Sequence, residues 1–185
     1  MLGQSTIALA WVHLDLMRWP LTVLYLLLLG LIAAYGLHRY WLVHLYNKHC
    51  RQIPRPARRF DQLPPVTVQL PVYNEGTVVQ RIIDAACQLD YPADRLQIQV
   101  LDDSTDGSAE MAEQRVAYWA GRGVNIQYRH RDRRTGYKAG ALAEAMPEAT
   151  GRFIAIFDAD FVPPRHFLRR TIHYFTDPSV GMVQA

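Results

Sequence analysis

The stretch "RFIAIFDADF", Arg152–Phe161, joins an apolar run to a pair of aspartates. The run from residue 153 to residue 157 is typical of a strand that is buried on both faces of a parallel sheet. Carboxylates are rarely buried unless they are paired or bind a metal, so Asp158 and Asp160 are expected to have a function. Because alternate side chains of an extended chain leave on the same face, the two carboxylates can converge on one cation.

Outward from this stretch, segments typical of strands alternate with segments typical of helices from Val66 onward. The expected strands are VTVQLPVYNE, LQIQVLDDS, VNIQYRHR and the FDADF strand, and the expected helices are GTVVQRIIDAACQL, SAEMAEQRVAYWAGR and TGYKAGALAEAM. A helix opened by Pro163-Pro164 and a last strand, VGMVQA, are expected to follow. This order predicts an α/β fold with a mostly parallel sheet.

Three of the expected strands end in a short polar group. Ligands of open parallel sheets bind outside the carboxyl ends of the strands, so a nucleotide site is expected there. The turn after the first strand has neither G-x-G-x-x-G nor a Walker lysine, which excludes an ordinary NAD-binding or P-loop protein. The polar groups are Tyr73-Asn74-Glu75, Asp102-Asp103, and Asp158 with Asp160.

A candidate transmembrane helix precedes this region. The uncharged run Trp19–Leu37 would span about 28 Å as a helix, close to the thickness of a bilayer core, and the helix is expected to continue to Tyr46. A cleaved signal peptide is the alternative, but the apolar run is long and its heavier basic flank follows it. The predicted organisation is an N-terminal segment (1–18), the transmembrane helix (19–46), a basic, proline-rich linker (47–65) and one domain (66–185).

Charge and cysteine content indicate the compartment. The chain has a net charge of +3, and no acidic residue lies between Asp15 and Asp61. By the positive-inside rule, this basic flank predicts an integral membrane protein of the inner or plasma membrane whose domain is cytosolic. No nucleic-acid-binding module is recognisable, so no nucleic-acid partner is expected. Two cysteines cannot form a disulfide framework, which suits a reducing compartment.

Four blocks, LPVYNE, QVLDDSTDGS, GYKAGAL and FDADF, resemble in this order the family 2 processive glycosyltransferases. Within that family, which includes cellulose, mannan and hyaluronan synthases, the chain is most similar to cellulose-synthase-like glucan and mannan synthases. A D-x-D motif alone is weak, but four ordered blocks cover most of the domain. The resemblance implies a GT-A, Rossmann-like sheet and an inverting transfer from UDP-glucose or GDP-mannose to a β-linked polysaccharide.

The chemistry of this family explains the carboxylates. A departing nucleoside diphosphate must be neutralised by a divalent metal and nearby cations. Oxygen ligands suit Mg²⁺ or Mn²⁺, with Asp160 as the first choice of ligand. By similarity to the D-x-D motif, Asp158 would help through the ribose or the metal shell. The alternative is that one of the two only caps the following turn.

The other expected site residues are implied mainly by the resemblance. Asp103 would contact the base or ribose, supported by Asp102, although DDSTDGS is also a good helix start in which Thr105, Asp106 or Ser108 caps free amides. Lys138 resembles the diphosphate-binding lysine, placed before a helix whose free amides favour anions. The run 129–134 could attract an anionic donor, but each of its charges is expected to be solvated. The remaining nucleotide contacts are Tyr73 and Glu75, with Pro71 shaping the turn.

The acceptor half of the site is not expected in these residues. An inverting transfer needs a general base, and no candidate follows the D-x-D block. The family's T-E-D and Q-x-x-R-W blocks, which carry the base and the acceptor site, do not occur here, so the chain is interpreted as the donor half of a longer, truncated enzyme that is inactive alone. Transfer of one sugar to a lipid acceptor and a non-catalytic nucleotide-sugar-binding membrane module remain alternatives.

Overall fold

The computed structural model describes residues 3–50, 55–76 and 78–184, with side chains described from Arg18 onward. It divides into two compact units at residue 54. The first contains α1 (Gly3–His49), whose part from Arg18 to His49 includes an 18-residue window with a mean hydropathy of 2.1 and is long and apolar enough to cross a membrane. The helix exceeds the predicted 19–46 at both ends, and it continues to His49 because neither Gly nor Pro follows Leu37 before that residue.

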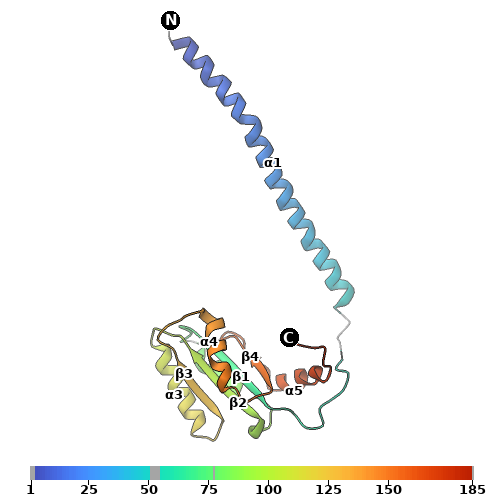
Figure 1. Cartoon of the computed structure of the whole chain (residues 1–185), viewed down its shortest axis with the longest axis vertical. Coiled ribbons are helices and arrows are strands. Elements are labelled where there is room, and N and C mark those ends of the chain that lie inside the picture. Colours follow the sequence, from blue (N-terminus) through green and yellow to red (C-terminus); the bar gives the residue numbers. More distant parts are fainter. Residues whose placement is uncertain (1–2, 51–54, 77, 185) are drawn as a thin grey trace. The chain divides into compact units, whose positions relative to one another are not determined.

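The second unit is built on a four-stranded sheet, and every pair of neighbouring strands is parallel. Figure 1 shows the strands in the order β3-β2-β1-β4. The strands are β1 (Val66–Val72), β2 (Leu96–Asp102), β3 (Ile126–His130) and β4 (Phe153–Ile156). The α/β fold with a parallel sheet is therefore confirmed.

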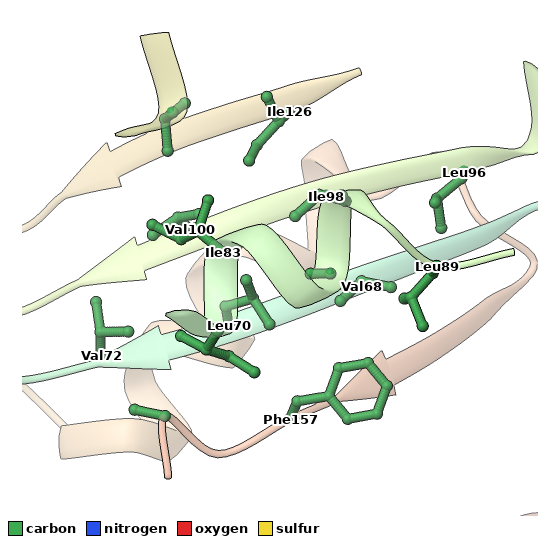
Figure 2. Close-up of a cluster of buried hydrophobic side chains, with 14 of the residues drawn as sticks. Val68, Leu70, Val72, Ile83, Leu89, Leu96, Ile98, Val100, Ile126 and Phe157 are labelled. Carbon is green, nitrogen blue, oxygen red and sulfur yellow. The ribbon is translucent and has the colours of Figure 1, made fainter. Parts of the chain in front are cut away.

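Helices cover both faces of the sheet. On one face, α2 (Val79–Cys87) and α3 (Ser108–Ala120) pack against the apolar residues of alternate strand positions, and Figure 2 shows Val68, Leu70, Ile98 and Ile83 gathered in this layer. On the other face, α4 (Tyr137–Ala145) packs through Ala141 and Ala145 on Leu101. The remaining short helices are η1 (Ala93–Arg95), η2 (Met146–Glu148), α5 (Phe167–Thr171) and η3 (Ile172–Thr176).

The face under α4 carries a buried polar ladder, formed by Thr67 and Gln69 of β1 with Gln97 and Gln99 of β2. The Thr67 hydroxyl donates to Gln97 Oε1 over 2.7 Å, and Gln69 Nε2 donates to Gln99 Oε1 over 3.0 Å. Gln97 Nε2 then donates to the Glu148 carbonyl, and Gln99 Nε2 to the Ala145 carbonyl. The ladder thereby ties the end of α4 and η2 to the sheet.

Gly151 shows how closely the chain returns to the sheet before β4. Its N–H donates to the Thr67 hydroxyl over 2.8 Å, and a Cβ at this position would lie 2.2 Å from the Thr67 backbone nitrogen. Only glycine allows this approach, because two backbone segments would have to separate to admit a methyl group.

Three expectations for the C-terminal part are wrong. Among the residues that the structure describes, the strand from Phe153 pairs only with β1 and lies at the edge of the sheet, so Ile156 is 48% exposed and the run is not buried on both faces. The segment 181–184 of VGMVQA forms no strand, and Ala185 lies outside the described residues. The helix after the prolines begins at Phe167, because residues 161–164 form no regular secondary structure and a turn at 165–166 precedes the helix.

The end of the predicted linker is part of the folded unit. The Phe60 N–H donates to His173 Nδ1 over 3.1 Å, and the Phe60 ring lies against those of His173 and Phe153. The Thr176 hydroxyl bonds both the N–H and the carbonyl of Arg58. Burial, together with the charge of Arg59, lowers the pKa of His173, in keeping with a neutral acceptor.

Candidate functional site

The expected site residues surround one cleft at the carboxyl ends of the strands. It has a volume of about 320 Å³. Its walls come from the ends of β1, β2 and β4 and from the start of α4, so segments nearly 90 residues apart in sequence meet there. The lining residues are Pro71, Val72, Tyr73, Glu75, Leu101, Asp103, Arg134, Lys138, Asp158, Ala159 and Asp160.

Asp158 and Asp160 share one wall of the cleft, although not for the reason expected from an extended chain. The strand ends at Ile156, and the two aspartates lie in a turn closed by the Phe161 N–H, which donates to the Asp158 carbonyl over 2.9 Å. The intervening Ala159 is buried, while both carboxylates are exposed. The turn, rather than strand alternation, presents the pair to the cleft.

Lys138 reaches the same wall from α4. Its ammonium forms an ion pair with the Asp158 carboxylate, and both side chains are about half exposed. The loop before α4 is compact, because a Cβ on Gly140 would lie 2.0 Å from the Thr135 carbonyl oxygen. This close approach requires glycine and sets the first turn of α4 directly beside the cleft.

Asp103 is held by a buried ion pair. Arg131 donates through Nε to Asp103 Oδ1 over 2.7 Å and through Nη2 to Oδ2 over 2.6 Å, and the two side chains are only 8% and 5% exposed. Arg131 also donates to the Thr135 and Tyr137 carbonyls and contacts Glu144. Its bonds with Asp103 raise the pKa of the Arg131 guanidinium above its ordinary value.

Asp102 lies outside the cleft, contrary to the expectation that it supports Asp103 there. It follows Ile98 and Val100 in the strand alternation and therefore faces α3, fully buried. There it accepts bonds from the Tyr128 hydroxyl over 2.6 Å and from the Ser104 N–H over 2.8 Å. Burial and this bond raise the pKa of Tyr128 above its ordinary value. Asp102 thus anchors the β2 end to β3.

The loop after Asp103 also starts a helix, as the alternative interpretation held. Asp106 accepts from the Ser108 N–H over 3.0 Å and from the Ser108 hydroxyl, and these bonds lower the pKa of Asp106. Asn74 connects this loop to the first turn: its N–H donates to Ser104 Oγ over 2.8 Å, and its Oδ1 accepts from the Thr105 N–H over 2.9 Å. The two loops therefore form one rim of the cleft.

Tyr73 forms the neighbouring wall with Arg134 stacked on it. The guanidinium carbon of Arg134 lies 3.4 Å from the Tyr73 ring centroid and 5.2 Å from that of Tyr137. Arg134 Nε is 3.8 Å from Asp103 Oδ2. Pro71 and Glu75 also line this side of the cleft.

The sequence interpretation missed Arg131 and Arg134, which it treated as solvated charges. Arg131 follows the last residue of β3 and bonds a carboxylate 28 residues earlier, and Arg134 lies in the loop that returns toward α4. A charge run looks the same whether its members are solvated or paired. The useful signal was position, because a charge directly after a strand of a parallel sheet lies at the ligand-binding edge.

The two cleft aspartates fit part of a Mg²⁺ or Mn²⁺ site. In residues 18–50, 55–76 and 78–184, no group of three or more His, Cys, Asp and Glu side chains could hold a metal ion. A metal beside Asp158 and Asp160 would therefore need oxygens from a ligand and from water. Mg²⁺ typically binds in this way, through one or two carboxylates together with substrate phosphates.

A larger hollow of about 530 Å³ shares the Asp158 and Asp160 wall and follows β4 toward α5 and the segment 182–184. Its lining is mainly aromatic and aliphatic, including Phe153, Phe157 and Phe175. The polar groups able to recognise a nucleotide lie instead in the smaller cleft.

Comparisons with known proteins agree with this geometry. The model of glycosyl transferase family 2 matches residues 67–185. Glucomannan 4-beta-mannosyltransferase 9 of Arabidopsis thaliana is 49% identical over 127 residues, which cover 66% of this chain and 24% of the relative. Glucomannan 4-beta-mannosyltransferase 1 of Oryza sativa subsp. japonica is 47% identical over 143 residues, covering 74% and 27%. The chain thus spans about a quarter of the length of these relatives.

Among solved structures, the mannosyltransferase PcManGT from Pyrobaculum calidifontis, in complex with GDP-Man and Mn²⁺, is similar with a TM-score of 0.62 and 33% identity. The match covers 80% of this chain and 43% of that protein. It confirms the GT-A, Rossmann-like fold expected from the four sequence blocks. From the fold, the shared blocks and the family match together, the chain belongs to glycosyl transferase family 2.

Proposed function

We propose that the domain binds a nucleotide-sugar donor together with Mg²⁺ or Mn²⁺, as the donor half of a membrane-anchored, inverting hexosyltransferase that builds a β-linked polysaccharide. The observation that carries the proposal is the convergence of four separate sequence blocks on one cleft. Nucleotide, diphosphate and metal each need a different group, and the cleft contains an aromatic ring, a lysine and two exposed carboxylates.

GDP-mannose is the first choice of donor, and UDP-glucose is the second. The two relatives described above are named as mannosyltransferases of glucomannan, and the similar structure contains GDP-Man with Mn²⁺. A mannan or glucomannan chain is the corresponding acceptor.

Each cleft residue has a proposed role. Tyr73, Glu75 and Asp103 bind the base and ribose, with Asp103 held in place by Arg131. Lys138, whose ammonium is already beside the aspartate turn, neutralises the diphosphate.

Asp160, with Asp158, holds the metal. The metal, when bound, neutralises the charge that develops on the departing diphosphate. Asp158 can exchange its lysine partner for the metal shell because both side chains are half exposed.

The helix Arg18–His49 is proposed to anchor the domain at the inner or plasma membrane, with the domain in the cytosol. Its length and hydropathy suit a membrane span, Lys48 lies in its last turn, and Arg55, Arg58 and Arg59 follow it. Such a basic flank favours the cytosolic side, where nucleotide sugars are present.

The test is donor binding by calorimetry on the full chain in detergent, with GDP-mannose and UDP-glucose, with and without Mn²⁺. We expect Mn²⁺-dependent binding of GDP-mannose that is lost in Asp160→Ala. The matched control is Asp94→Ala, which removes a carboxylate that is 79% exposed in η1, before β2 and therefore at the opposite end of the strand from the cleft. Equal binding by both variants would refute the metal role of Asp160, and no binding by the folded wild-type chain would refute the donor site.

A further inference from the structure

We propose that Arg134 occupies the place of the nucleotide base in the cleft and acts as a displaceable internal competitor of the donor. The inference rests on the proposed function, because it assumes that Tyr73 and Asp103 bind the base. The positive charge of Arg134 suggests that this residue attracts an anionic donor. In the proposed role, its side chain instead weakens donor binding.

The geometry around Arg134 is that of a base-binding site filled by a side chain. Its flat guanidinium covers the Tyr73 ring at 3.4 Å, a stacking distance, and the Tyr137 ring lies 5.2 Å away. Its Nε points the positive charge at Asp103 Oδ2 from 3.8 Å. A nucleotide base uses the same two features, since it stacks on an aromatic face and donates N–H groups to a carboxylate.

Asp103 has acceptor capacity left for such a donor. A carboxylate offers about four lone-pair positions, and Arg131 uses one on each oxygen. The pair with Arg131 is buried and bidentate, so Asp103 keeps its position when its other partner changes. Arg134 therefore approaches a carboxylate that is already fixed.

Arg134 is held much more weakly than Arg131. Its distance of 3.8 Å from Asp103 is too long for a hydrogen bond, and its side chain is 36% exposed. Stacking on Tyr73 is the main contact, and a cation over an aromatic ring at an exposed site contributes about 0.5–1 kcal/mol. Such a side chain can leave when a base arrives, whereas Arg131 cannot.

Displacement of Arg134 by the donor predicts the direction in which nucleotide affinity changes when the Arg134 side chain is removed. A donor that must remove Arg134 from Tyr73 loses the free energy of that contact, so deletion of the side chain strengthens nucleotide binding. A residue that instead binds the nucleotide gives weaker binding when it is deleted. The exposed neighbour Arg133 provides a control for charge, because its removal changes the net charge by the same amount.

The experiment measures the affinity of GDP with Mn²⁺ by calorimetry for the full-length wild type, Arg134→Ala and Arg133→Ala, each checked for its thermal unfolding midpoint. We expect Arg134→Ala to bind about two- to fivefold more tightly than Arg133→Ala. The gain should persist with guanosine, because it arises at the base and not at the phosphates.

The other outcomes separate the two proposals. Equal or weaker binding by Arg134→Ala than by Arg133→Ala overturns the competitor role, while binding by the wild type still supports the donor site. If neither the wild type nor either folded variant binds GDP, the donor site itself fails and the role of Arg134 with it.

Discussion

Replacing Arg131 by methionine tests whether the buried pair with Asp103 holds the cleft together. Methionine keeps most of the volume of the side chain but removes five donors, among them the two that bond Asp103. Asp103, at 5% exposure, then becomes a buried carboxylate whose nearest remaining cation is Arg134 at 3.8 Å. The carbonyls of Thr135 and Tyr137 lose a donor in the same step.

The magnitude follows from this burial. Removing one partner of a buried, hydrogen-bonded ion pair costs about 3–5 kcal/mol, which is a large share of the stability of a typical domain. For a domain of this size, 1 kcal/mol corresponds to about 3–5 °C in the thermal midpoint, so Arg131→Met should lower it by about 10–20 °C. Adding Asp103→Asn should recover several degrees, because the second change removes the uncompensated charge.

The assay is thermal unfolding of the full chain in detergent, followed by circular dichroism, with Arg133→Met as the matched control. The exposed control should shift the midpoint by no more than about 2 °C, since surface substitutions rarely exceed 0.5 kcal/mol. A shift of similar size in both variants, or a double variant less stable than Arg131→Met, would refute the reasoning from the buried pair.

Two further predictions concern the scaffold. Gly151→Ala should lower the thermal midpoint by about 3–15 °C, because its Cβ would lie 2.2 Å from the Thr67 nitrogen and overpacking costs about 1–3 kcal/mol. Gly107→Ala, whose Cβ would have nothing within 4 Å, is the control, and equal midpoints for the two variants would contradict the close approach. The pKa of His173 is lowered in the folded chain, so its contribution is complete above the unfolded value of about 6.5 and is lost as the pH falls toward the folded value. His173→Asn keeps an acceptor for the Phe60 N–H but does not titrate, so its midpoint should fall less than that of the wild type between pH 7.5 and 5.5; identical falls would remove His173 as the cause.

The order of the first four strands and most of the residues that line the cleft could be predicted from the sequence. Parallel strands bring their carboxyl ends to one edge, so polar groups after β1, β2 and β4 had to meet. Side chains two residues apart in a strand lie on the same face of the sheet, so the position of Val100 would also have placed Asp102 under α3.

The remaining features depend on tertiary neighbours. The apolar run from Phe153 is compatible with a central strand or an edge strand, and only the observed order assigns β4 to the edge. Arg131 could not be paired with Asp103 from a charge run, because the two are 28 residues apart. Nor does spacing show that Arg134 lies on the Tyr73 ring, since this depends on the path of the loop before α4.

The polar ladder under α4 helps to determine the register between β1 and β2. Apolar alternation alone tolerates a shift of two residues between β1 and β2, because the same faces stay buried. Such a shift would set Gln99 opposite Pro71 and would separate the Thr67 hydroxyl from Gln97, leaving buried polar groups without their partners. The hydrogen bonds of the glutamines therefore favour one register over the shifted ones. Because the register determines where the carboxyl ends of β1 and β2 lie, these buried bonds also determine the geometry of the cleft.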